Sequence, residues 1–155
     1  MGKGKGIKRH ESLYPLSHHH HSALFLALKL KRAGTEEARD SVEKVWHDLK
    51  EFWEPDGQNH FREEEEILLP AYYEYGPIET PEIQEMLIEH VKIRSAFYSL
   101  IQDSPDSTPE ELLPRMHELG QMLEEHVRKE ERIIFPVIEK AIPEEKLQEL
   151  SVYFT

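Results

Sequence analysis

The sequence predicts an all-α fold: an up-down-up-down four-helix bundle with a short C-terminal helix. Three observations predict it. Apolar residues recur at helical spacing through four long segments, and proline, glycine, serine or threonine punctuates their ends. No strand-like alternation is sustained over several residues. The chain has 155 residues, enough for one domain with a single core.

The first two helices are predicted from their caps and apolar stripes. Ser17 is a candidate N-cap for a helix that ends at about Ala33, before Gly34. Thr35 is a candidate N-cap for the second helix, which carries an apolar stripe. The segment 55–57, Pro-Asp-Gly, should interrupt that helix by a kink or a short break. Helix then resumes at about residue 59 and continues to Tyr75.

The last two long helices begin with the same device. Thr80 caps a helix with Pro81 in its first position, and Thr108 caps another with Pro109. The helix that begins at Pro81 should end at about residue 102, and the helix that begins at Pro109 should end at about residue 141. A short helix over residues 144–153 could cover one end of the bundle.

Composition limits the function classes. The net charge is −12, with 31 acidic and 19 basic residues, which argues against nucleic acid as a partner. No apolar run is long enough to span a bilayer, so no membrane partner is predicted. Cysteine is absent, which removes disulfides and thiolate metal sites, and a cytoplasmic location is the default expectation. Residues 1–9 read as a flexible basic tail, and residues 10–155 as the folded domain.

One motif occurs twice. His60 is followed by Glu64, another glutamate, an apolar triplet and Pro70, and His126 is followed in the same order by Glu130 and Pro136. Residues four apart share one face of a helix. One His-x3-Glu arises easily by chance on a solvated helix, whereas two copies with the same apolar-proline ending indicate two halves of one metal site.

Two further histidines belong to apolar stripes. Residues 18–21 are four consecutive histidines, well inside the chain, which argues against an affinity tag. Helical spacing favours His20 as the inward ligand and keeps His21 as the alternative, with His18 and His19 exposed or supporting. His90 lies in the middle of the third apolar stripe. The spacing places His47 and His117 outward and leaves His10 unassigned.

Six side chains would then converge in the bundle. Ten histidines without cysteine favour nitrogen and oxygen coordination of iron or manganese, with zinc also possible. Two glutamates can bridge two metal ions, and four imidazoles would complete the ends. The candidate metal ligands are His20, His60, Glu64, His90, His126 and Glu130.

With these residues the chain resembles the hemerythrin-like, HHE cation-binding domains over roughly residues 10–142. The resemblance implies a four-helix bundle with two non-haem iron ions, bridged by carboxylates and an oxo or hydroxo group. It also implies that the domain binds or senses a small ligand such as dioxygen or nitric oxide, or senses or handles iron under redox stress. Whether the domain has a protein partner is unknown from the sequence.

The chain departs from the oxygen-carrier pattern of that family. Carriers have His-x3-His on the third helix, whereas Arg94 follows His90 here, and Arg94 could pair with a nearby carboxylate instead. Carriers also place an aspartate five residues after the last histidine, where this chain has Glu130 at four. Stable dioxygen carriage is therefore less expected than redox or iron-responsive behaviour. A peroxidase-like di-iron oxidoreductase is the alternative, and a structural bundle without metal is the third hypothesis.

Overall fold

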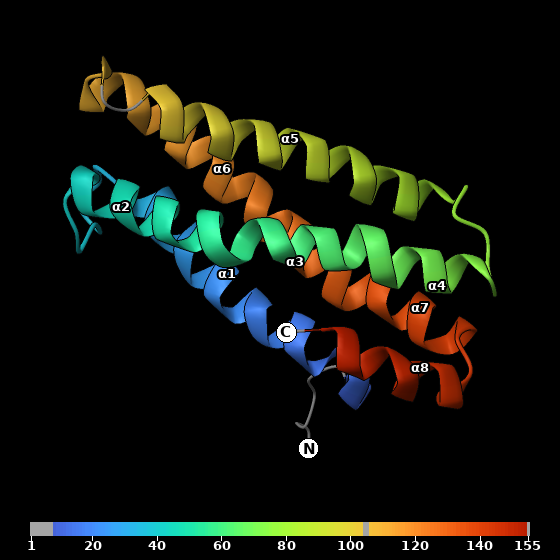
Figure 1. Cartoon of the computed structure of the whole chain (residues 1–155). Coiled ribbons are helices and arrows are strands. Elements are labelled where there is room, and N and C mark those ends of the chain that lie inside the picture. The colour runs from blue at the N-terminus through green and yellow to red at the C-terminus, as the bar shows by residue number, and fades with distance from the viewer. Residues whose placement is uncertain (1–7, 104–105, 155) are drawn as a thin grey trace.

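The structure, a computed structural model, describes residues 8–103 and 106–154, and every regular element in them is helical. The all-α prediction is therefore confirmed. Four long helical segments run in alternating directions (Figure 1). They are α1 (Tyr14–Arg32), α2–α4 (Val42–Phe52, Gln58–Glu63 and Leu69–Tyr73), α5 (Pro81–Asp103) and α6–α7 (Pro109–Lys129 and Phe135–Ala141).

The two helices predicted from Thr-Pro begin as expected. The Thr108 side chain accepts from the Glu111 N–H and the Glu111 side chain accepts from the Thr108 N–H, which is a complete capping box. Thr80 likewise accepts from the N–H of Ile83. Pro114 lies inside α6 without ending it.

The predicted starts of the first two helices are wrong. α1 begins at Tyr14, with Pro15 in its first turn, so Ser17 lies within the helix and its hydroxyl donates to Glu131 instead. The cap of α2 is Ser41 rather than Thr35. Gly34 has a positive φ of 73°, and the Thr35 hydroxyl bonds back to the carbonyl of Arg32, so residues 33–41 form a longer connection than expected.

Three π-helical turns join the pieces of the long helices: Trp53–Gly57, Glu64–Leu68 and Glu130–Ile134. The segment 55–57 therefore neither breaks the helix nor ends it. In the other two turns, the N–H of Leu69 bonds to the carbonyl of Glu64 and that of Phe135 to Glu130, each five residues back. Pro70 and Pro136 follow directly. A proline clashes with the carbonyl four residues before it, and the wider turn accommodates that carbonyl.

The core consists of two apolar clusters. One lies toward the connection between α1 and α2 and includes Leu30, Leu49, Phe97 and Leu119. The other lies toward the opposite end and includes Leu16, Met86 and Phe135, together with residues of α8. On each long helix, buried histidine or glutamate lies between residues of the two clusters. A polar layer therefore crosses the middle of the bundle.

A short helix, α8 (Glu144–Leu150), and the 3₁₀ turns Glu11–Leu13 and Ser151–Tyr153 pack together at one end. This agrees with the predicted terminal helix. Most of the predicted basic tail, residues 1–7, lies outside the described residues, but Arg9 is buried and pairs with Glu131 and Glu139. None of the described helices is long and apolar enough to cross a membrane.

Candidate metal centre

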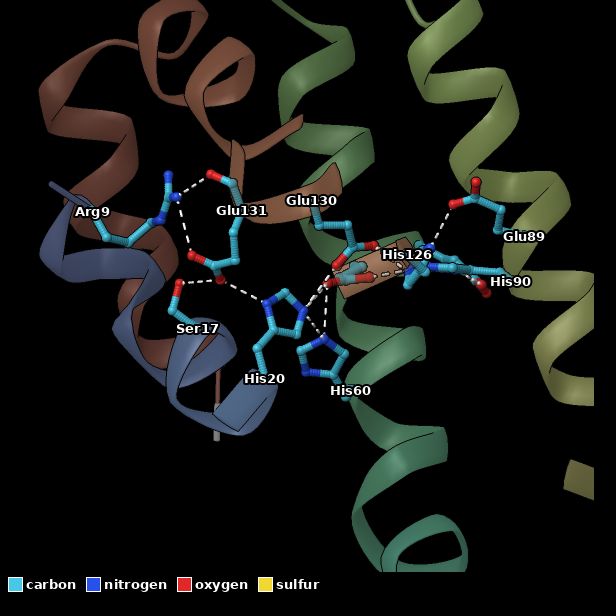
Figure 2. A network of polar contacts seen from close by, with 11 residues as sticks. Arg9, Ser17, His20, His60, Glu89, His90, His126, Glu130 and Glu131 are labelled. Carbon is cyan, nitrogen blue, oxygen red and sulfur yellow. Dashed lines mark hydrogen bonds and ion pairs between the residues drawn. The ribbon is translucent and has the colours of Figure 1, made fainter. Parts of the chain in front are cut away.

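All six predicted ligands meet in the polar layer, and all six are buried. They come from every long helix: His20 from α1, His60 from α3, His90 from α5 and His126 from α6. Glu64 and Glu130 are the first residues of the two later π-helical turns. Figure 2 shows His20, His60, His90 and His126 gathered around Glu130.

The six side chains form two groups of four that could each hold a metal ion. One group is His20, His60, Glu64 and Glu130; the other is Glu64, His90, His126 and Glu130. Within each group the ligand atoms lie within 4.8 Å of one another. Both glutamates belong to both groups, so the two positions share their carboxylates.

Each carboxylate has one oxygen turned toward each group. For Glu64, Oε2 is 2.9 Å from His60 Nε2, and Oε1 is 3.1 Å from His90 Nε2. For Glu130, Oε1 is 3.0 Å from His20 Nε2, and Oε2 is 2.8 Å from His126 Nε2. Two oxygens of one carboxylate that face two different histidines give the arrangement needed to bridge two cations.

The contacts inside the layer do not satisfy its polar atoms. Among the described residues, both oxygens of Glu64 and the Nε2 of His126 are buried without a hydrogen-bond partner, although oppositely charged atoms lie close by. His20 Nε2 and His60 Nε2 also face each other at 3.1 Å. Buried polar atoms are rarely left without a partner, and a cation between them would satisfy several at once. The residues present therefore fit a metal pair with nitrogen and oxygen ligands.

Mutual charge strongly shifts the pKa values in the layer. Burial and Glu130 act to raise the pKa of Glu64, but the nearby histidines outweigh them and lower it to about 2. Burial lowers the pKa of His90, but the carboxylates of Glu130, Glu64 and Glu65 beside its ring raise it to about 11. The pKa of His126 is likewise raised to about 9, against its burial, chiefly by Glu130. Protons on these histidines therefore balance the two glutamates, and a metal must displace those protons to bind.

A family model for the hemerythrin HHE cation-binding domain matches residues 12–138 of the chain. The chain belongs to this family. The match covers all six converging residues, in agreement with the resemblance drawn from the sequence. No curated protein and no solved structure matches the chain significantly.

Of the four histidines that converge in this HHE domain, three are held by an outer set of carboxylates. The Nδ1–H of His20 donates to Glu131 at 2.6 Å, that of His90 to Glu65 at 2.6 Å, and that of His126 to Glu89 at 2.8 Å. An ionised carboxylate can only accept, so Nδ1 keeps its proton, and the proton that a metal would displace is the one on Nε2, which faces the centre.

Each outer carboxylate is in turn held by a cation. Arg9 pairs with Glu131, and the Ser17 hydroxyl donates to the same glutamate. Lys129 pairs with Glu89. Arg94 pairs with Glu65 at 2.8 Å, in agreement with the expectation from the sequence that it could pair with a nearby carboxylate. Arg94 therefore supports His90 indirectly.

Sequence reasoning assigned no role to these outer carboxylates. Glu65 and Glu131 were visible as the second glutamate of each motif copy, and that repetition was the available signal. Glu89 gave no such signal, since it is one acidic residue among many. Its partner, His126, lies on another helix.

His60 is supported differently from the other three. Within the described residues its Nδ1 makes no hydrogen bond to a carboxylate, and its ring stacks on the ring of His19 at 4.8 Å. His19 also contacts the ring of Phe52 at 5.3 Å. Burial and then His60 lower the pKa of His19 to about 4, so this ring is neutral. A cavity of about 10 Å³ lies against His19, His20, His60 and His126, among apolar side chains.

The remaining histidines lie outside the centre. His20 is buried whereas His21 is exposed, which favours His20 over the alternative left open by the spacing. His18 and His47 are exposed, as expected. His117 is half-buried rather than on the surface, because its Nε2–H donates to the carbonyl of Ala33 at 2.7 Å. His10 bonds to Ser12 and Glu144 at the end of the bundle.

Proposed function

We propose that this HHE domain binds two iron ions, one in each four-residue group, with Glu64 and Glu130 shared between them. The observation that carries the proposal is the pair of groups with both carboxylates in common. Four imidazoles and two carboxylates without a thiolate suit iron better than a closed structural zinc site, which favours four dedicated ligands. Iron in such a centre supplies one-electron redox chemistry and coordination positions for a small molecule.

We further infer that the centre binds or senses a small ligand such as dioxygen or nitric oxide, or that it responds to iron itself. The cavity beside His20 and His60 has room for about one water molecule, which limits any ligand there to a few atoms. Its walls include Trp53, Phe61 and Phe97, so an uncharged ligand would enter it most readily.

The test is metal content per chain, by elemental analysis with an optical spectrum, on protein purified without added metal. About two irons per chain are expected. The matched variant Glu64→Gln/Glu130→Gln should lose them, because an amide offers one weak oxygen ligand in place of an anionic bridge. Wild-type protein that contains no metal, and takes up none when ferrous iron is added without oxygen, would refute the proposal.

A di-iron oxidoreductase that acts on peroxide is the second candidate, favoured by the same small cavity at the centre. Peroxide has two heavy atoms and fits the size limit. Turnover of peroxide by the iron-loaded protein, lost in His90→Ala, would favour the enzyme. A protein with its full iron content and no turnover would favour the binding or sensing role.

A further inference from the structure

The two halves of the centre are related by the repeated motif. In each copy, the second glutamate supports the histidine of another helix. Glu65, from the first copy, bonds to His90 of α5, and Glu131, from the second copy, bonds to His20 of α1. The repeat therefore pairs His20 with His90, and His60 with His126.

The two halves differ at one position, which is the residue directly before His90 in one half and before His20 in the other. The residue before His90 is Glu89, which accepts the Nδ1–H of His126 at 2.8 Å. The residue before His20 is His19, which lies at the corresponding place beside His60 and stacks on it at 4.8 Å. His126 thus has a carboxylate that accepts its Nδ1–H, whereas His60 has a stacked imidazole ring in that place.

We infer that the two metal positions are unequal: the His90–His126 position is filled first and holds its ion tightly, and the His20–His60 position is the weaker one, whose ion exchanges. The inference rests on the proposed two-ion function and says which half of the centre releases or takes up an ion.

The physical reason is that the supporting residue sets the orientation of a histidine ring and the basicity of its Nε2. A carboxylate that accepts from Nδ1–H fixes the ring and makes Nε2 a better donor to a cation. Both histidines of the tight half have such a carboxylate, and Arg94 and Lys129 hold those carboxylates in turn. In the weaker half, within the part of the chain that the structure describes, only His20 has one. A stacked ring restrains the His60 plane but adds no negative charge.

The position of the small cavity also favours ion exchange at the His20–His60 position. The small cavity is lined by both histidines of the weaker half and by His126 alone of the tight half. His19, which also lines it, is only half-buried. Water and competing ligands therefore reach the His20–His60 position more directly.

The decisive experiment supplies the missing carboxylate. Co²⁺ is titrated into the metal-depleted full chain against a chromophoric chelator, and the two stepwise dissociation constants are measured for wild type, His19→Glu and His18→Glu. His19→Glu should tighten the weaker ion by roughly 10–100-fold, the usual size of such a support. His18→Glu makes the same charge change at the adjacent exposed position and should change neither constant by more than about threefold.

Two further variants keep the inference falsifiable if His19→Glu folds poorly. His19→Gln offers an uncharged acceptor and should tighten the weaker ion by a smaller factor. Glu89→Gln should weaken the tighter ion by roughly 10–100-fold. Far-ultraviolet circular dichroism checks that each variant is folded.

The outcomes separate the inference from the proposed function. Wild type that binds fewer than two Co²⁺ ions per chain at saturation contradicts the two-ion function itself. Two ions with equal constants, or a response of the tighter ion to His19→Glu and of the weaker ion to Glu89→Gln, would leave the function standing and overturn the inference.

Discussion

The polar layer and the two apolar clusters on either side of it are stabilised by different forces. The clusters are packed hydrocarbon, and their stability depends little on pH or on ions. The layer holds six buried ionisable groups whose charges balance only if protons or cations are present. The bundle thus consists of two parts that fold by burial, joined by a layer whose stability depends on solution conditions.

Metal removal should give the largest effect and should act on the layer alone. Ligand binding stabilises a folded protein by about 4 kcal/mol at a thousandfold excess over the dissociation constant. Thermal melts with saturating Co²⁺ and with chelator are therefore expected to differ by many degrees. The variant Glu64→Gln/Glu130→Gln should melt at one temperature under both conditions. A wild type insensitive to metal would remove the proposed distinction between layer and clusters.

A substitution that leaves a cavity in an apolar cluster should lower the free energy of unfolding by nearly as much, and equally with and without metal. Leu30 is fully buried and lies ten residues from His20, about 15 Å along α1. Leu30→Ala should destabilise by about 2–5 kcal/mol in urea unfolding, and by the same amount with and without metal, since sites so far apart are additive. Ile88→Ala, at an exposed position, serves as the control and should change stability by less than about 0.5 kcal/mol.

Within the layer, the histidines and the glutamates should respond oppositely to pH, whereas the apolar clusters should respond little. His90 has its pKa raised from 6.5 to about 11, so its stabilisation is complete below 6.5 and is lost as the pH rises toward 11. Glu64 has its pKa lowered from 4.5 to about 2, so its contribution is present above 4.5 and is lost as the pH falls toward 2.

Metal-depleted protein should therefore be most stable between about pH 4.5 and 6.5 and weaken above it. Metal-loaded protein should gain stability over the same rise, because protons no longer compete for the histidines. Urea midpoints between pH 5 and 9, with chelator and with Co²⁺, test this. Parallel curves would mean that the layer does not exchange protons for metal.

The smallest expected effect comes from removing a cationic side chain that pairs with an outer carboxylate. Arg94→Gln releases Glu65, which then holds His90 less firmly, so the affinity for the tighter ion should fall by up to about tenfold. Arg62→Gln, at an exposed position one helix away, is the matched control and should leave the affinity unchanged. Chelator competition with Co²⁺ measures both, and an equal loss in the two variants would point to net charge instead of orientation.

The sequence predicted the candidate site better than it predicted the supports around it. The doubled motif and the apolar stripes identified six residues that the structure brings together, because ligands four residues apart are placed by helix geometry alone. The outer carboxylates act between helices, and the residues around Glu89 in the sequence do not indicate its contact with His126 on another helix. The same holds for His19, whose place beside His60 depends on how α1 packs against α3.

By itself, the sequence determined the helical class, the family and the starts of α5 and α6, since caps, prolines and apolar periodicity act over a few residues. The tertiary structure decided the start of α1 at Tyr14, the start of α2 at Ser41, and the continuity of the helix through residues 55–57. It also decided which carboxylate supports which histidine. Those features join residues far apart in the chain, such as Glu131 with His20 and Arg9, and only the packing of whole helices brings them within hydrogen-bonding distance.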